Sequence, residues 1–405
     1  MRIAVLSDAP SESRVAATPE TVKKYATLGA SVAVERGAGV AAGVPDGEFE
    51  AAGATVADRA AVLGNADIVL SVRRPRAETL DGAKRGALLI AVMDPHGHER
   101  EVRLLAERGL AAFAMELMPR ITRAQVMDVL SSQANLAGYR AVVDATAEYG
   151  RALPMMMTAA GTVPAARIFV MGAGVAGLQA IATARRLGAV VTGTDVRPAA
   201  KEQVESLGAK FIAVEDEEFR QAETAGGYAK QMSAEYQAKQ AALTASHIAK
   251  QDIVITTALI PGRPAPKLVT AEMLASMRPG SVVVDLAVER GGNVEGALDG
   301  EMSTTANGVK VVGYSNVGRL AATASSLYAR NLYSFVETLV DKSAKTLAVN
   351  WDDELVKATL LTRDGQAVHP LFGAAAAPQP TPSQPALAPA ATPAPAPTLA
   401  DAVTL

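Results

Sequence analysis

Cysteine is absent from this chain of 405 residues. Disulfide bonds, thiolate nucleophiles and cysteine-ligated metals are therefore excluded, and the absence fits a reducing compartment. Long apolar runs are missing too, because the stretch GALLIAVM stops at Asp94, far short of the roughly 20 residues that a membrane helix needs. The first residues, MRIAVLSDAP, lack the long apolar region of a signal peptide. We expect a cytoplasmic protein with no direct membrane insertion.

Neither sign of charge dominates, since 39 basic residues face 42 acidic ones and the net charge is -3. This balance gives no indication of nucleic-acid binding, so no nucleic-acid partner is expected. Histidine is scarce, and its four positions form no metal-ligand pattern with carboxylates on a shared helix face. We therefore predict no metal site and mostly solvated side chains for His96, His98, His247 and His369.

Short β-type runs alternate with helical patterns in the first part of the chain. Examples of the runs are RIAVL, SVAVER, ADIVLSV and ALLIAVM, and the helical pattern TPETVKKYATLG separates the first two. In that pattern Thr18 is a predicted N-cap, Pro19 suits the first helical position and Gly29 suits the C-terminal stop. Such alternation predicts an α/β fold with a parallel sheet.

A second α/β run begins near residue 166 and contains the sequence VMGAGVAGLQ. Its glycines, Gly172, Gly174 and Gly177, follow a predicted strand and open a predicted helix. Gly172 permits a tight turn, Gly174 lets the backbone approach a pyrophosphate, and Gly177 lets helix and strand pack closely. The free N–H groups and the dipole of the helix N-terminus favour the phosphates. The motif in this setting predicts a dinucleotide site.

The next predicted strand, AVVTGTD, ends at Asp195. An acidic residue at this position accepts the ribose 2′-hydroxyl and repels a 2′-phosphate, which favours NAD(H) over NADP(H). Arg197, two residues further on, could instead receive a 2′-phosphate. Because Asp195 occupies the discriminating position itself, we predict NAD(H).

A second glycine cluster, Gly37, Gly39 and Gly43, also follows a predicted strand. Its spacing is one residue too long for the dinucleotide motif, and the sequence VPDG interrupts the expected helix. We interpret it as a glycine-rich loop without a cofactor.

The segment MPRITRAQVMDVLSSQ, residues 118–133, has two readings. On a helix, Gln125, Asp128 and Ser131 are three residues apart and would share one polar stripe. Thr122 and Gln125 also match a capping box, in which case the other polar side chains are simply solvated. Spacing alone leaves both readings open.

Three stretches carry a family resemblance: residues 118–142, residues 154–197 and residues 222–232. They closely resemble the NAD(H)-binding component, domain I, of proton-translocating nicotinamide nucleotide transhydrogenase. The likeness spans about residues 1–372 and leaves out the tail of alternating Pro and Ala. The resemblance implies that Arg120, Gln125, Asp128 and Ser131 hold the dihydronicotinamide, and that Tyr228 belongs to a mobile loop that closes over the nucleotide. It further implies nucleotide contacts at Val175, Val196, Gly227, Gln240 and Leu259.

The resemblance also implies an architecture and an activity. We expect two Rossmann-like domains with parallel sheets: an outer one from residues 1–130 and 305–372, and an NAD(H)-binding one from residues 131–304. Residues 373–405 are a predicted disordered tail. The expected enzyme is an NAD(P)+ transhydrogenase, of the Si-specific or the proton-translocating Re/Si type. As a homodimer it would pass hydride from NADH to NADP+ held by a partner subunit, coupled to a membrane-spanning proton channel. Its place would then be peripheral, on the cytoplasmic face of the inner membrane.

Two alternatives stay open. Alanine dehydrogenase shares the scaffold and the ESRVAATPE start, where Arg14 matches a substrate-binding arginine. However, Arg73 falls near the position of that family's lysine, and Asp94 falls at its histidine position unless a shifted alignment brings in His96. Arginine is permanently charged and cannot act as the base that such an enzyme needs. The other alternative is an NAD-binding regulatory module with no redox role.

Overall fold

The first of two parallel sheets gathers the N-terminal strands. The computed structural model describes residues 1–221, 232–260, 262–314 and 316–372. This sheet has six strands in the order β3-β2-β1-β4-β5-β6, all parallel. Its apolar strands are buried on both faces, as a parallel sheet requires. The strands are β1 (Arg2–Val5), β2 (Ser31–Glu35), β3 (Thr55–Ala57), β4 (Ile68–Arg73), β5 (Leu88–Val92) and β6 (Ala111–Ala114).

Short helices connect these strands. They are α1 (Pro19–Thr27), α2 (Asp46–Ala51), α3 (Arg59–Leu63) and α4 (Glu99–Glu107), with 3-10 helices η1 (Val40–Ala42), η2 (Ala77–Leu80) and η3 (Met115–Leu117). The predicted ends of α1 are confirmed: Thr18 caps it through the N–H of Thr21, Pro19 begins it, and Gly29 follows with a φ of +79°. The glycine cluster at Gly37–Gly43 forms a tight loop around η1.

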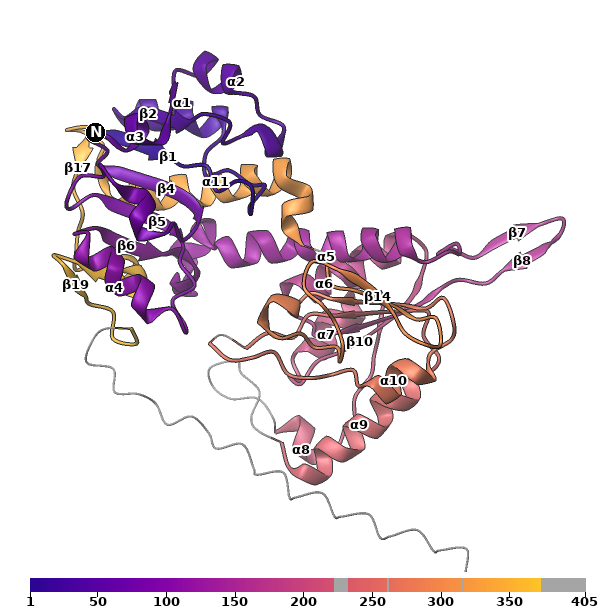
Figure 1. Cartoon of the computed structure of the whole chain (residues 1–405). Coiled ribbons are helices and arrows are strands. Elements are labelled where there is room, and N and C mark those ends of the chain that lie inside the picture. The colour runs from indigo at the N-terminus through magenta and orange to yellow at the C-terminus, as the bar shows by residue number, and fades with distance from the viewer. Residues whose placement is uncertain (222–231, 261, 315, 373–405) are drawn as a thin grey trace, which may run out of the picture.

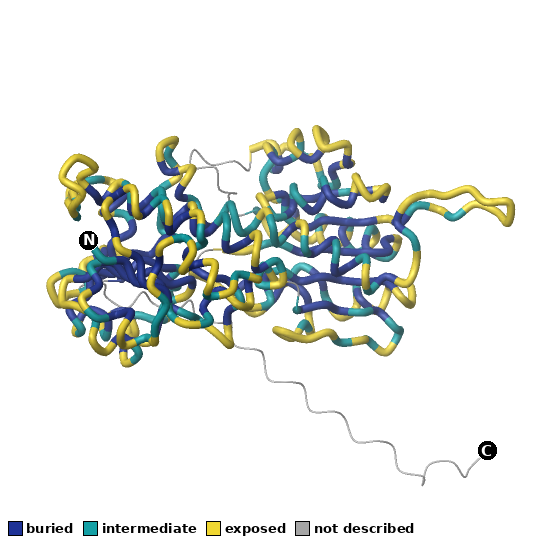
Figure 2. Tube along the Cα trace, turned by 90° about the horizontal axis from the view of Figure 1, so that it is seen from above, coloured by how far each residue is buried: buried dark blue, intermediate teal, exposed yellow. Residues whose placement is uncertain are grey.

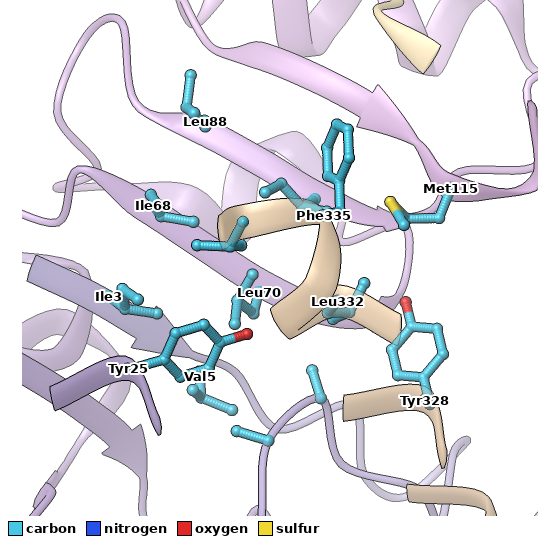
Figure 3. Packing of buried hydrophobic residues seen from close by; sticks show 14 of the residues in the cluster. Ile3, Val5, Tyr25, Ile68, Leu70, Leu88, Met115, Tyr328, Leu332 and Phe335 are labelled. Atoms are coloured by element: carbon cyan, nitrogen blue, oxygen red, sulfur yellow. The ribbon is translucent and has the colours of Figure 1, made fainter. Parts of the chain in front are cut away.

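A late helix completes the core of this first sheet. The helix α11 (Ala321–Thr338) supplies Tyr328, Leu332 and Phe335, which are fully buried beside Tyr25 and the strands β1, β4 and β5 (Figure 3). The helix α12 (Glu354–Thr359) and two small ribbons complete the same region; the ribbons pair β16 (Val340–Asp341) with β17 (Thr346–Leu347) and β18 (Thr362–Arg363) with β19 (Gln366–Ala367).

The second sheet has seven strands in the order β11-β10-β9-β12-β13-β15-β14. All its pairings are parallel except that of the edge strand β14. The prediction of two Rossmann-like parallel sheets is thereby confirmed, whereas the antiparallel edge was not predicted. The strands are β9 (Arg167–Met171), β10 (Val190–Thr194), β11 (Lys210–Phe211), β12 (Ile253–Thr256), β13 (Val282–Asp285), β14 (Met302–Thr304) and β15 (Lys310–Val312).

The elements around this sheet include α6 (Val175–Arg186), α7 (Ala200–Ser206), α8 (Glu217–Arg220), α9 (Ala234–Ile248) and α10 (Ala271–Ser276), with 3-10 helices η5 (Val288–Arg290) and η6 (Val317–Leu320). The domain boundaries stay a prediction. Because β15 still pairs with β13 in this sheet, we propose that the chain returns to the first unit after Val312 rather than at about residue 305.

One long helix joins the two sheets. The helix α5 (Val129–Glu148) packs against α11 of the first unit and against α6 of the second (Figure 1). Beyond it, the hairpin β7 (Met156–Thr158) and β8 (Gly161–Val163) extends away from the body of the molecule, and its residues are largely exposed (Figure 2). Within the described ranges, no helix is long and apolar enough to cross a membrane.

Candidate functional site

The turn between β9 and α6 is built around the predicted glycines. Gly172 has a φ of +105°, a conformation that other residues rarely adopt, and Gly174 precedes α6 without any side-chain cap. A Cβ atom on Gly177 would lie 1.7 Å from the carbonyl oxygen of Gly172, so no other residue fits there. The hydroxyl of Thr257, just after β12, donates to the same oxygen at 3.0 Å. The free N–H groups at the start of α6 are thus held in place, and a helix start of this kind favours an anionic group.

Asp195 directly follows β10 and lies beside this turn. Its side chain is 8% exposed, and its carboxylate accepts a hydrogen bond of 2.8 Å from the N–H of Ala173. Arg197 forms an ion pair with the same carboxylate. The structure therefore brings the glycine turn, Asp195 and Arg197 together at the carboxyl ends of the neighbouring strands β9 and β10.

The segment before α5 is not one continuous helix. A 3-10 helix, η4 (Thr122–Met127), ends at Asp128, whose extended backbone separates it from α5. The prediction that Thr122 forms a capping box is wrong, since Ile121 precedes η4 and provides no side-chain cap. Asp128 is the cap instead. Its carboxylate accepts two hydrogen bonds from Ser131, one from the backbone N–H at 2.9 Å and one from the side-chain hydroxyl at 2.5 Å. Aspartate is a stronger N-cap than threonine.

The four predicted nicotinamide residues occupy this broken segment. Asp128 and Ser131 contact each other, while Arg120 and Gln125 are exposed on the stretch before them. The single polar stripe that we predicted for Gln125, Asp128 and Ser131 is wrong as a feature of one helix, since the backbone changes direction at Asp128. This change of direction between η4 and α5 leaves side chains from both helices at the surface around the start of α5.

A close helix crossing relates this segment to the glycine turn. A Cβ atom on Gly138 of α5 would lie 2.0 Å from the carbonyl oxygen of Ala176, in the first turn of α6. Near the crossing, Asn135 donates to the side chain of Gln179 at 3.3 Å. Ser131 is seven residues before Gly138, or about 10 Å along the helix axis. The start of α5 is therefore held at a fixed distance from the glycine turn.

Three of the predicted nucleotide contacts are exposed apolar side chains at the carboxyl ends of strands. Val175 follows β9, Val196 follows β10 and Leu259 follows β12. Because these strands are neighbours, the three residues lie along the edge where ligands of open α/β sheets bind.

The other predicted contacts differ in their setting. Gln240 lies on α9, and its side-chain oxygen accepts the N–H of Val214 at 2.9 Å, so it supports the loop after β11. Gly227 and Tyr228 lie outside the described residues.

An ionic network around the buried pair Arg14–Glu12 connects the two units, and sequence reasoning missed it. Arg14 donates to Glu12 at 2.7 Å and to Gln133 of α5 at 2.8 Å. Arg73 donates to Glu12 at 3.1 Å and lies 3.6 Å from Glu289 of η5. Burial opposes the charge on Glu12, but the hydrogen bonds and the charge of Arg14 outweigh it and lower the pKa of Glu12 to about 2. No spacing rule relates these residues, because three of the contacts are long-range.

The histidines are less solvated than expected. His369 is buried, and burial lowers its pKa. His247 is half-buried against Phe169, hydrogen-bonded to Thr192 at 2.9 Å, and its pKa is likewise lowered by burial. The prediction of solvated side chains is wrong for these two. Among the residues with described positions, no group of three histidines or carboxylates is placed to hold a metal.

Comparison with known proteins identifies the family. The model of the alanine dehydrogenase/PNT N-terminal domain matches residues 7–137, and that of the C-terminal domain matches residues 141–370. The chain belongs to the alanine dehydrogenase/PNT family. Within this family, it is 55% identical over 378 residues to an NAD(P) transhydrogenase subunit alpha of Rhodospirillum rubrum, covering 91% of this chain and 98% of that protein.

Other members of the alanine dehydrogenase/PNT family are similar to different degrees. The crystal structure of transhydrogenase from Sinorhizobium meliloti is 63% identical, with a TM-score of 0.83, and covers 91% of this chain and all of that one. Alanine dehydrogenase of Halomonas elongata is 31% identical over 91% of this chain and 95% of its own length. The predicted resemblance to the transhydrogenase α subunit is confirmed, and these homologues support a transhydrogenase component, an oxidoreductase with an NAD-binding Rossmann-like fold.

Proposed function

We propose that this chain is the NAD(H)-binding catalytic component of a proton-translocating transhydrogenase. It passes hydride from NADH to NADP+ bound on a partner subunit. The observation that carries the proposal is the crossing of α5 over α6 at Gly138, because it holds the Asp128–Ser131 helix start beside the glycine turn. One nucleotide can then have its pyrophosphate at the turn and its nicotinamide at the helix start.

The residues present suit NAD(H). The close packing of the turn requires glycine at Gly172 and Gly177, the backbone at Gly174 is open on its Cβ side, and Asp195 is the acid that favours a free ribose. The exposed apolar residues Val196 and Leu259 border the same edge. NADP(H) is expected on the partner subunit, where a different site must accept its 2′-phosphate.

Hydride transfer between two nicotinamide rings requires the protein to position the rings and does not require it to transfer a proton. The bound nicotinamide supplies the hydride, and no heteroatom of a substrate gains or loses a proton. Gln125 is suited to hydrogen-bond the carboxamide, while Arg120, Asp128 and Ser131 orient the ring. Holding two reacting rings in a productive geometry contributes as much as about 7–11 kcal/mol to a barrier. Tyr228 is proposed to close over the nucleotide.

We further propose the assembly around this chain. A partner subunit brings NADP(H), and a membrane-spanning component couples transfer to proton translocation, which places the chain at the cytoplasmic face of the inner membrane. The relatives are named as α subunits of a transhydrogenase, which supports partner subunits. A homodimer is supported by the hairpin β7–β8, which exposes Met156 and Met157 on its first strand and Met155 just before it.

Alanine dehydrogenase activity is disfavoured by the setting of Arg14 and Arg73. The resemblance makes Arg14 the counterpart of a substrate-binding arginine, but here its guanidinium is buried and pairs with Glu12. Arg73, near the position of the lysine of that family, pairs with Glu12 and Glu289. Both cations already have carboxylate partners within the protein, and a permanently charged arginine cannot act as the base that an alanine dehydrogenase needs.

The test is to mix this chain with a soluble NADP(H)-binding component and follow hydride exchange between NADH and an NADP+ analogue. Gln125→Asn should slow exchange far more than it weakens NADH binding, whereas Gln366→Asn, an exposed control on β19, should change neither. Tight NADH binding without exchange would contradict the proposal and favour a regulatory module. NADH oxidation that depends on pyruvate and ammonia would replace it with alanine dehydrogenase.

A further inference from the structure

Every acceptor position of the Asp195 carboxylate is filled by the protein itself. One oxygen, Oδ1, accepts the backbone N–H and the Nε–H of Arg197, each at 2.9 Å. The other, Oδ2, accepts the N–H of Ala173 at 2.8 Å and the Nη2–H of Arg197 at 3.0 Å. An ionised carboxylate offers about four lone-pair sites. No site is therefore left for a ribose hydroxyl in this conformation.

The two backbone donors to Asp195 are fixed in position, whereas the two guanidinium donors can move away from the carboxylate. The N–H groups of Ala173 and Arg197 belong to the glycine turn and to the loop after β10, and they stay in place. The side chain of Arg197 is one-third exposed, and its guanidinium lies at the flexible end. It also reaches the carbonyl oxygen of Ala173 at 3.3 Å, so it lies across the turn on which a dinucleotide binds. Only the guanidinium can leave to make room.

We propose that Arg197 is an internal competitor for Asp195 and thereby sets the nucleotide selectivity of this site. The proposal rests on the binding of NAD(H) at the glycine turn. A ribose with free hydroxyls must displace the guanidinium to reach the carboxylate, which weakens NADH binding. A 2′-phosphate meets an acid whose charge is already neutralised, and the displaced guanidinium is a bidentate partner for it. Arg197 thus lowers the discrimination that Asp195 alone would give.

The experiment compares NADH and NADPH binding to the full chain by isothermal titration calorimetry, without a partner subunit. Arg197→Gln removes the competitor, so the Kd for NADH should fall about twofold to fivefold, within the range of a partly exposed ion pair. The Kd for NADPH should rise, so that the ratio of the two constants grows by at least about fivefold. For Arg197→Lys the ratio of the two constants should lie between those of the unaltered chain and Arg197→Gln, because an ammonium group keeps the charge but cannot bind in a bidentate way.

The control is Arg186→Gln, which removes the same charge at the far end of α6 and should leave both constants unchanged. Equal weakening of NADH and NADPH in Arg197→Gln would overturn the proposal, since Arg197 would then be an ordinary nucleotide contact. Unchanged constants would overturn it as well. If Arg197→Gln lowers thermal stability, Arg197→Lys decides by the same ratio. Failure of the unaltered chain to bind NADH would instead sink the proposed function.

Discussion

The crossing of α5 over α6 can be tested with one methyl group. In Gly138→Ala, the new Cβ would lie 2.0 Å from the carbonyl oxygen of Ala176, whereas real Cβ atoms keep at least 3.0 Å. The two helices must therefore separate by about 1 Å. Overpacking of this kind costs about 1–3 kcal/mol, and the higher helix propensity of alanine returns about 1 kcal/mol. We expect a net loss of about 1 kcal/mol in the free energy of unfolding.

The functional effect of Gly138→Ala should exceed its effect on stability. The new Cβ would contact Ala176 rather than Gly172 or Gly174, so the Kd for NADH should change by less than about threefold. The helix start at Asp128 is displaced from the turn, and a misplacement of about 1 Å can slow a positioned reaction by about 100-fold. Hydride exchange with a soluble NADP(H)-binding component, together with urea unfolding, gives both numbers.

The matched control is Gly150→Ala, just beyond the end of α5, where an added Cβ meets nothing within 4 Å. It should leave both exchange and stability nearly unchanged. Normal exchange in Gly138→Ala, with stability reduced as expected, would show that the crossing does not set the distance between the nicotinamide site and the phosphate site. The proposed function would then lose the observation that chiefly supports it.

Three further variants test other parts of the structure. Because its folded-state pKa is lowered to about 2, Glu12 stabilises the fold fully above its unfolded pKa of 4.5 and loses this contribution as the pH falls from 4.5 to about 2. Glu12→Gln should flatten the acid limb of stability measured by urea unfolding between pH 5 and 3, and an unchanged slope would contradict this origin. Ser131→Ala removes a hydroxyl contact with Asp128 but keeps the capping N–H. The rate of hydride exchange should therefore fall, while the free energy of unfolding changes by about 1 kcal/mol or less. A loss of stability without a loss of exchange would assign Ser131 a structural role. Met157→Glu, at a side chain 81% exposed on the hairpin, should convert a dimer into a monomer in light scattering without lowering Tm, and a persistent dimer would place the contact elsewhere.

The parts of the fold that sequence predicted are those controlled by local chemistry. Thr18, Pro19 and Gly29 mark the ends of α1 because capping and positive φ depend on a few neighbouring residues. The glycine turn was predictable for the same reason, since Gly172 and Gly177 serve a strand, a turn and a helix that are adjacent in sequence.

The parts that sequence did not predict depend on contacts between distant segments or on competition between similar signals. The sequence indicated a cap at Thr122, whereas the cap is Asp128, where the extended backbone separates η4 from α5. The pairing of Arg14 with Glu12 and Gln133 requires the fold, as does the approach of Gly138 to Ala176. Even Asp195, placed correctly by its motif, could not be recognised from sequence as saturated by Arg197.

The length of α5 gives the molecule a mechanical property. The helix has 20 residues, or about 30 Å, and begins at the Asp128–Ser131 contact. At its far end, Glu148 accepts hydrogen bonds from Lys310 of β15 at 3.0 Å and from Tyr314 at 2.8 Å. Because α5 is held at both ends, a displacement of one end moves the other end with it. A partner that moves β15 in the second sheet would thereby also move the residues proposed to hold the nicotinamide.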